Sequence, residues 1–199
     1  MFIIEEENAI SKHHLKIIQE KVLGFNFPWF YQLSSTTDKF PFLSHTLMPR
    51  YDEFDGSDGK INSEYHGLFL DIFNSFCIRH NLKVRKVLRA ALNLSVVPYK
   101  KFPYTDPHVD HAIEHYNMLM YLNDCPHATT IVFEEASDGK IVEHPLEDVN
   151  TSLTIGKEIE PKQGKIVVFS GCHFHAHRFV NESERRVVCV MTFTVQNYE

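Results

Sequence analysis

The sequence predicts a mainly β protein, a jelly roll supported by two helices near its N-terminus. Two helical patterns occupy the first 80 or so residues, whereas from residue 88 onward the apolar residues alternate with polar ones or form short runs. Helices followed by about eight strands are typical of this arrangement. Because no repeat, linker or low-complexity segment divides the 199 residues, we expect one domain, with a helical part over about 1–82 and a jelly-roll core over about 83–197.

Composition narrows the class of protein. Hydrophobic residues make up 43% of the chain and aromatic residues 13%, enough for one substantial core. The formal net charge of −6 gives no support to a nucleic-acid-binding surface. The longest apolar runs are of strand length, and the acidic N-terminus lacks the features of a secretion signal. We therefore expect a soluble, cytoplasmic protein with no nucleic-acid or membrane partner; the composition leaves the oligomeric state open.

Two helices are predicted in the N-terminal part. Ser11 can cap the first, and Gly24 follows it where a left-handed C-terminal residue is expected. The second helix covers Asn62 to His80 and is the strongest amphipathic pattern in the chain. The apolar stripes consist of Leu15, Ile18 and Val22 in the first helix, and of Tyr65, Leu68, Phe69, Ile72, Phe73 and Phe76 in the second.

The remaining elements are aromatic turns and short strands. Residues 25–60 should pack aromatic side chains over a sheet edge, and the run from Asp55 to Gly59 should form an exposed loop that lacks the acidic ladder of a calcium site. The predicted strands are Leu88–Val97, Val109–Ala112, Asn117–Leu122, Thr130–Phe133, Lys140–Glu143, Ser152–Ile155, Lys165–Phe169 and Val187–Val195.

The cysteines point to no metal site or disulfide framework. None of the four forms a C-x-x-C pair, and their spacing is wide. We expect reduced, mostly buried thiols at Cys77, Cys125, Cys172 and Cys189.

The motif Pro107-His108-Val109-Asp110 is the most informative stretch. In an extended segment alternate side chains point to the same face, so His108 and Asp110 would aim at one point. A third ligand could come from the stretch 171–177 if the two strands are neighbours in a closed sheet. Two histidines and one carboxylate on one side of a metal leave its other side open, as in non-haem Fe(II) oxygenases. That stretch offers three histidines on one strand face: His173, His175 and His177.

Further elements surround this motif in a characteristic order. They are Tyr99, the strand Asn117–Asn123, a P-x-x-G turn at Pro161 that leads to an apolar strand ending at Phe169, then His175 and Arg186. This order and spacing resemble the 2-oxoglutarate and Fe(II)-dependent dioxygenases, and within them the prolyl 4-hydroxylase-like branch, over roughly residues 88–195. The resemblance implies a double-stranded β-helix, the cupin-like form of the jelly roll.

The resemblance also implies a metal site. His108 and Asp110 match the first two iron ligands. His175 matches the third, because in this family that histidine follows the apolar strand by about six residues. His177 is the next candidate. We expect His111 to be an exposed loop residue; the alternative is a role beside the metal or the substrate. His115 and His127 are expected at the surface.

A cosubstrate site follows from the same resemblance. Arg186 is similar to the residue that holds the far carboxylate of 2-oxoglutarate; Arg185 is the alternative, because neighbouring strand residues point to opposite faces. An arginine buried without a carboxylate would cost several kcal/mol, so a guanidinium in the core favours an anionic ligand. Tyr121 and Tyr99 resemble hydroxyl donors to that carboxylate, and Leu119, which shares strand parity with Tyr121, should form an apolar wall.

The implied function is that of an Fe(II)- and 2-oxoglutarate-dependent dioxygenase. It would use O2 to hydroxylate a C–H bond of a peptide, with prolyl side chains as one candidate, or of a small molecule, and would convert 2-oxoglutarate to succinate, with ascorbate as reductant. Two alternatives stay open: a cupin-type metal enzyme that uses His173, His175 and His177 without 2-oxoglutarate, and a non-catalytic jelly-roll binding module. In this fold, loops select the substrate, and the composition of these loops does not indicate which substrate this protein binds.

Overall fold

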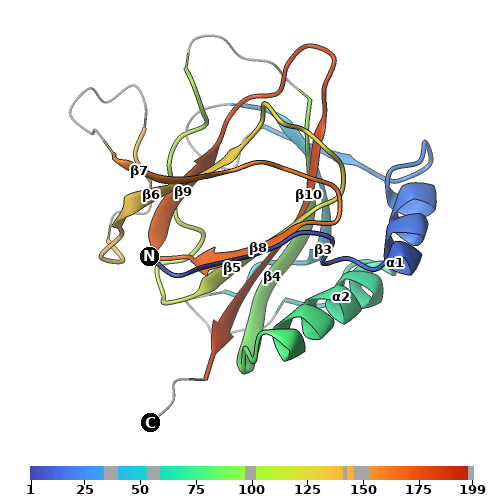
Figure 1. Ribbon diagram of the computed structural model, residues 1–199, viewed down its shortest axis with the longest axis horizontal. Helices are drawn as coiled ribbons and strands as arrows, with labels where there is room; N and C mark the ends of the chain where they lie inside the picture. Colours follow the sequence, from blue (N-terminus) through green and yellow to red (C-terminus); the bar gives the residue numbers. More distant parts are fainter. Residues whose placement is uncertain (34–39, 53–58, 97–101, 141–142, 146–152, 197–199) are drawn as a thin grey trace.

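Two antiparallel β-sheets face each other, and two helical segments cover the outer face of the larger sheet (Figure 1). The computed structural model describes residues 1–33, 40–52, 59–96, 102–140, 143–145 and 153–196. The largest apolar cluster lies between the helices and the larger sheet, a second lies between the sheets, and a third lies on the other face of the smaller sheet. This architecture confirms the predicted jelly roll with supporting helices.

The larger sheet has the strand order β1-β8-β5-β10-β4-β3-β2, and the smaller sheet has the order β7-β6-β9. From β4 to β10 the chain passes repeatedly between the sheets: β4 and β5 belong to the larger sheet, β6 and β7 to the smaller, and β8, β9 and β10 to the larger, the smaller and the larger in turn. Such crossing is typical of a jelly roll. The strands are β1 (Ile3–Glu6), β2 (Phe30–Gln32), β3 (Phe42–Met48), β4 (Val84–Ser95), β5 (Tyr116–Tyr121), β6 (Thr130–Ala136), β7 (Ile155–Ile159), β8 (Ile166–Ser170), β9 (His173–His177) and β10 (Arg186–Val195).

Five of the predicted strands correspond to β4, β5, β6, β8 and β10, with ends shifted by up to four residues. Three predictions are wrong or incomplete. Val109–Ala112 is not a strand, and only the preceding His108 makes isolated bridges, to His175 and Glu143. The strand expected over Ser152–Ile155 instead begins at Ile155. Of the strand expected over Lys140–Glu143, residues 141–142 lie outside the described part, as do Val97, Ser152 and most of the Asp55–Gly59 loop.

Three strands were not predicted, β1, β2 and β3, whereas β9 is the strand that the analysis of residues 171–177 assumed. The aromatic stretch before the second helix, expected to pack side chains over a sheet edge, itself supplies β2 at the sheet edge and β3, which lies between β2 and β4. Prolines at 28, 41 and 49 break the apolar alternation around these strands, so the pattern resembles turns. The N-terminal part therefore contributes strands as well as helices to the structure.

The first helix is an α-helix that continues as a π-helix. α1 covers Lys12–Ile17 and η1 covers Ile18–Val22. Ser11 caps it as predicted, because the Ser11 hydroxyl accepts a hydrogen bond from the His14 N–H at 3.2 Å. The prediction for Gly24 is wrong, since Gly24 is not among the residues with positive φ. A side chain there would instead approach the Glu20 carbonyl oxygen to 2.9 Å, so close packing explains the glycine.

The second helix, α2, covers His66–Arg79, four residues shorter at its start than predicted. Asn62 is held by β3 instead: its N–H donates to the Leu47 carbonyl at 2.8 Å, and its side chain donates to the Thr46 carbonyl at 2.9 Å. The predicted apolar face is confirmed, because its central members are fully or almost fully buried: Phe69, Ile72, Phe73 and Phe76.

Truncation of the helix core should destabilise the fold strongly. Phe73 is 1% exposed and meets Phe193 of β10 edge to face, with ring centroids 5.1 Å apart. We expect Phe73→Ala to lower the free energy of unfolding by about 3–5 kcal/mol. Ile78→Ala, on the exposed side of the same helix at 80% exposure, should change it by less than about 0.5 kcal/mol. Urea unfolding of both variants checks this, and equal losses would contradict the packing described.

A buried lysine joins β1 to β8. The Lys165 side chain is 7% exposed, and its Nζ lies 2.8 Å from Glu5 and 3.5 Å from Glu7. Burial alone would raise the pKa of Glu5, but hydrogen bonds from Lys165 and Lys157 outweigh it and lower that pKa. A lowered carboxyl pKa contributes stability above the ordinary value of about 4.3, and this contribution is lost as the pH falls through the folded value.

This pairing predicts a pH-dependent phenotype. Glu5→Gln should cost about 1 kcal/mol at pH 7 and should flatten the loss of stability between about pH 5 and pH 3. Glu7→Gln is the matched control, because Glu7 is 51% exposed and its contact with Lys165 is longer. Urea unfolding across this pH range measures both; an unchanged acid dependence in Glu5→Gln would count against the pairing.

The cysteine prediction holds. All four thiols are free; Cys77, Cys125 and Cys189 are buried and Cys172 is partly exposed. Neither helix in the described part of the chain has the length and apolarity needed to span a bilayer.

Candidate functional site

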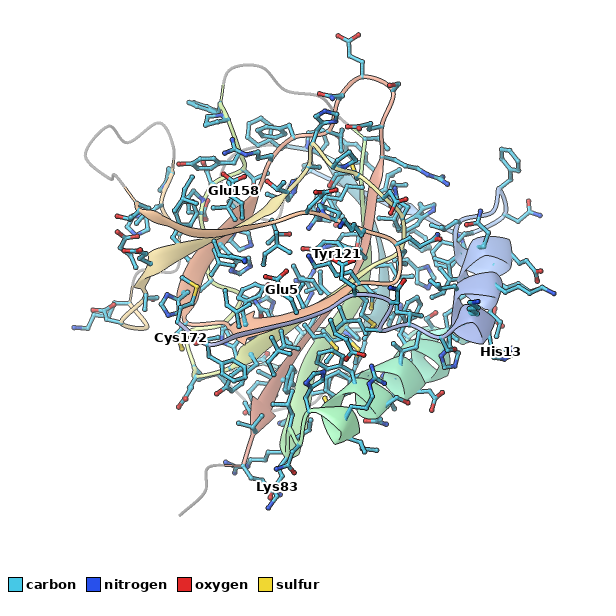
Figure 2. All side chains as sticks on the ribbon, viewed as in Figure 1. Glu5, His13, Lys83, Tyr121, Glu158 and Cys172 are labelled. Atoms are coloured by element: carbon cyan, nitrogen blue, oxygen red, sulfur yellow. The ribbon has the colours of Figure 1, made fainter. Side chains whose placement is uncertain are left out.

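A cavity of about 420 Å³ lies between the two sheets. Strand parity decides which residues face it: Leu119, Val188 and Val190 line the cavity, whereas Met118 and Met120 pack toward the helices. Tyr121 lies on the same inner face as Leu119, in the interior of the molecule (Figure 2). The predicted shared orientation of Leu119 and Tyr121 is therefore confirmed.

His108 and His175 stand side by side at one end of this cavity. The His108 N–H donates to the His175 carbonyl at 3.0 Å, and the His175 N–H donates to the His108 carbonyl at 2.9 Å. This exchange ties the Pro107–Asp110 segment to β9 and places the two imidazole centroids 4.6 Å apart. Asp110 joins them, with Oδ2 3.4 Å from His175 Nε2. The structure thus brings together the three side chains that the sequence singled out.

Backbone carbonyls face Nδ1 of both imidazoles. His108 Nδ1 lies 3.0 Å from the Asp106 carbonyl oxygen, and His175 Nδ1 lies 3.4 Å from the His173 carbonyl oxygen. A carbonyl can only accept, so Nδ1 carries the proton in both contacts, and in the neutral ring Nε2 is the nitrogen left to bind a metal; His175 Nε2 also lies 3.4 Å from Asp110 Oδ2 and 3.4 Å from Asn117 Nδ2. Backbone carbonyls orient metal-binding histidines in the same way. The donor set fits a metal of the Fe(II) class, two neutral imidazoles with one carboxylate.

The side chains are near one another without already having ligand geometry. Among the described residues, no group of three or more His, Cys, Asp or Glu side chains is spaced to hold a metal ion. The other carboxylate oxygen of Asp110, Oδ1, contacts two arginines. A guanidinium nitrogen of Arg50 lies 3.4 Å from Oδ1, and one of Arg89 lies 3.3 Å from it. Metal binding at this place therefore requires the side chains to draw closer together.

The electrostatics favour the protonation states that metal ligands need. Burial lowers the pKa of His108, and the neighbouring His175 lowers it further. Burial would raise the pKa of Asp110, but the hydrogen bond with His175 and the charges of His175 and Arg89 bring it well below its usual value. At neutral pH His108 is neutral and Asp110 is ionised, which are the forms that bind metals.

Arg186 lies in the same cavity without a carboxylate partner in the described part of the chain. Its side chain is 5% exposed, one guanidinium nitrogen donates to Thr130 Oγ1 at 2.9 Å, and its Nε is buried with no hydrogen-bond partner. The Tyr121 hydroxyl shares Thr130 Oγ1 at 2.7 Å. Burial lowers the pKa of Arg186 and raises that of Tyr121. Arg185 is exposed, so of the two candidates Arg186 is the one that faces the cavity.

The other candidate residues have mixed outcomes. Tyr99 lies outside the described residues. His177 lines the cavity, and its Nδ1 meets the Arg178 carbonyl oxygen at 2.9 Å. His173 Nδ1 meets the Phe133 carbonyl oxygen at 3.1 Å on β6. His127 is exposed, as predicted, and pairs with Glu184 at 2.8 Å.

The surface assignments of His111 and His115 are wrong. His111 is 4% exposed and its Nε2 meets Thr192 Oγ1 at 2.8 Å; His115 is 1% exposed and its Nδ1 meets the Ile113 carbonyl oxygen at 2.7 Å. Both rings are buried in the segment between Asp110 and β5, where their centroids lie 4.8 Å apart. Local sequence carries no sign of that burial.

The sequence interpretation also missed four polar residues of the site. Asn117 Nδ2 lies 3.4 Å from His175 Nε2, and Thr130 connects Arg186 with Tyr121. Arg89 and Arg50 hold Asp110. The parity of the predicted strand over Leu88–Val97 places Arg89 on one face with Asn93 and could have identified it; nothing in the sequence around Arg50 points to the site.

Comparison with solved structures identifies the class of fold. A 2OG-Fe(II) oxygenase family oxidoreductase from Burkholderia pseudomallei has 15% identity and a TM-score of 0.67 over 98% of this chain and 86% of that one. The non-haem alpha ketoglutarate dependent carbocyclase SnoK of nogalamycin biosynthesis has 10% identity and a TM-score of 0.63 over 96% and 78%. HygX from Streptomyces hygroscopicus, solved with nickel and 2-oxoglutarate, has 9% identity and a TM-score of 0.57 over 98% and 84%.

The chain therefore has the fold that these oxygenases share. In sequence, no protein-family model and no curated protein matches it.

Proposed function

We propose that the protein is an Fe(II)- and 2-oxoglutarate-dependent dioxygenase that hydroxylates a C–H bond. One observation carries the proposal: a single cavity holds two imidazoles, whose Nδ1 atoms face backbone carbonyls, beside a carboxylate, and it also holds a buried arginine without a carboxylate partner among the described residues. The imidazoles and the carboxylate suit a metal, and the arginine suits an anionic cosubstrate.

His108, Asp110 and His175 would hold the metal. Their Nδ1 hydrogen bonds and the low pKa of Asp110 prepare two neutral donors and one charged donor, which leaves a net positive ion with open positions. When bound, Fe(II) and 2-oxoglutarate supply the oxidising chemistry with O2, and 2-oxoglutarate is converted to succinate and CO2. The chain's part is to position the reactants and to exclude water.

Arg186 would bind the far carboxylate of 2-oxoglutarate. The guanidinium group of Arg186 can form two charged hydrogen bonds to one carboxylate, and its buried Nε needs such an acceptor. Thr130 and Tyr121 orient the guanidinium, and Leu119 supplies an apolar wall. The part given to Tyr99, a further hydroxyl for the same carboxylate, rests on the sequence resemblance alone.

Solved structures of this fold support the choice of cofactors. HygX binds nickel and 2-oxoglutarate, and the epimerase SnoN, with a TM-score of 0.56 and 8% identity, was solved with Fe3+ and alpha ketoglutarate. We propose Fe(II), 2-oxoglutarate and O2 for this protein, ascorbate as its reductant, and the cytoplasm as its compartment. Its substrate would be a peptidyl side chain, with prolyl as one candidate, or a small molecule.

Succinate formation tests the proposal. Wild-type protein with Fe(II), ascorbate, air and 2-oxoglutarate should form succinate slowly even without a prime substrate. His108→Ala should abolish this turnover, and Arg186→Ala should require at least about tenfold more 2-oxoglutarate, since each lost charged hydrogen bond costs about 1.5–3 kcal/mol. Succinate is measured by mass spectrometry. Equal rates in wild type and His108→Ala would refute the assignment of the metal site.

A further inference from the structure

Two more arginines reach the metal end of the cavity. Arg50 follows β3 and Arg89 lies on β4; both line the cavity, and both contact Oδ1 of Asp110. Arg50 is 45% exposed and Arg89 18% exposed, so the pair extends from the opening toward the interior. Both influence the charge of Asp110, but no ligand has so far been assigned to either guanidinium.

One carboxylate cannot satisfy this pair. The contacts, 3.3 and 3.4 Å, are longer than the about 2.7–2.9 Å typical of charged N–H···O hydrogen bonds. Asp110 is the one carboxylate that the described residues offer to either guanidinium, and each guanidinium carries five N–H groups. Both side chains line the cavity, so a molecule bound there can reach N–H groups that Asp110 does not use.

Metal binding would increase the positive charge at this place. When Asp110 binds a divalent ion, its single negative charge is shared between that ion and two guanidinium groups. The arginine pair then presents a net positive surface directly beside the open side of the metal. An anion is the ligand that such a surface favours.

The far carboxylate of 2-oxoglutarate cannot be that anion if Arg186 holds it. Arg89 lies opposite Thr192 on β10, six residues from Arg186 along the same strand. At about 3.3 Å per residue this is a backbone separation of roughly 20 Å. The guanidinium groups have different partners, Thr130 for Arg186 and Asp110 for Arg89, so the cavity has two cationic places, and the second can take another anion.

Aromatic side chains line the same cavity. Phe40 and Phe179 come from segments far apart in the sequence, and their rings meet edge to face with centroids 4.7 Å apart. Together with the cationic pair they suit a ligand that has an apolar body and an anionic group.

We propose that Arg50 and Arg89 bind a carboxylate or phosphate group of the prime substrate and hold that substrate beside the metal. This inference rests on the proposed function, because it places the anion next to an occupied metal and cosubstrate site. The substrate class is thus a small anionic molecule with an apolar part, or a peptide that presents such a group.

Calorimetric titration of matched probes tests this inference. Protein is first loaded with Ni(II) and saturating 2-oxoglutarate, so that Arg186 is occupied, and is then titrated with phenyl phosphate and benzoate, and with the neutral benzyl alcohol and benzamide. The anionic probes should bind at least about tenfold more tightly than the neutral ones. Arg50→Gln together with Arg89→Gln should remove this preference, and Arg89→Lys should retain part of it.

Arg85→Gln is the matched control, because Arg85 is exposed on β4 and does not line the cavity. It should retain the full preference. Arg50→Gln alone, at the exposed end of the pair, should reduce the preference if the double variant does not fold. Equal binding of charged and neutral probes by wild type would overturn the inference.

Two other results would also overturn it, and they separate its failure from that of the proposed function. Loss of 2-oxoglutarate binding in the double variant at full nickel occupancy would show that the pair binds the cosubstrate and not the substrate. Failure of wild type to take up nickel and 2-oxoglutarate in the loading step would reject the proposed function, and the inference with it.

Discussion

Replacement of His175 by alanine is expected to lower the affinity for Fe(II) or Ni(II) at least about 100-fold. Loss of a group that only supports a ligand typically costs 10–100-fold, so loss of a ligand should cost more. His175 is the side chain that faces both His108 and Asp110, and its Nδ1 faces a backbone carbonyl whereas its Nε2 faces Asp110. Metal content after equilibrium dialysis measures the effect.

Two neighbouring histidines make this prediction specific. His177→Ala tests the second candidate from the same strand face, and His173→Ala is the control, because His173 does not line the cavity. Both should keep metal affinity within a few-fold of wild type. A larger loss in His177→Ala than in His175→Ala would move the third ligand to His177, and comparable losses in all three variants would favour a three-histidine cupin site.

Arg186→Met is expected to weaken 2-oxoglutarate binding roughly 100-fold or more without destabilising the protein. The loss of two charged hydrogen bonds accounts for the affinity. Stability should be equal or higher, because a buried guanidinium with an unsatisfied Nε is replaced by an apolar side chain of similar length. This combination distinguishes a ligand-binding arginine from a structural one, whose removal would lower both properties.

Calorimetry with 2-oxoglutarate on the nickel-loaded protein and urea unfolding of the apoprotein measure the two effects separately. Arg185→Met is the matched control, because Arg185 is exposed, and it should change neither quantity appreciably. If Arg186→Met unfolded at much lower urea concentration, the arginine would have a structural partner, and its assignment to 2-oxoglutarate would lose its basis.

The sequence was informative wherever strand parity decides the outcome. Leu119 and Tyr121 face inward together, and Arg186 faces the cavity whereas Arg185 does not. Parity follows from the pleat of a strand, so a local pattern is sufficient. The meeting of His108 with His175 needed the added assumption that their segments are neighbours, and the bridges between them support it. The ligand roles themselves stay predictions.

Features that arise from packing between distant segments were not predictable. The Arg50 and Arg89 contacts with Asp110 depend on how β3 and β4 pass the Pro107–Asp110 segment. Burial of His111 and His115 depends on a turn that the sequence around them does not predict. The additional strands are stabilised by pairing, β3 with β4 and β2 with β3, not by a clear alternation of their own.

Absorbance of the Fe(II) protein without oxygen tests the central claim most directly. Addition of 2-oxoglutarate should produce a visible charge-transfer band that saturates at one 2-oxoglutarate per chain. The band should be absent in His108→Ala and should require much more 2-oxoglutarate in Arg186→Met. If wild-type protein took up iron but gave no band with 2-oxoglutarate, the cavity would not be the site of a 2-oxoglutarate-dependent oxygenase, and a cupin-type metal site or a binding module would be the better description.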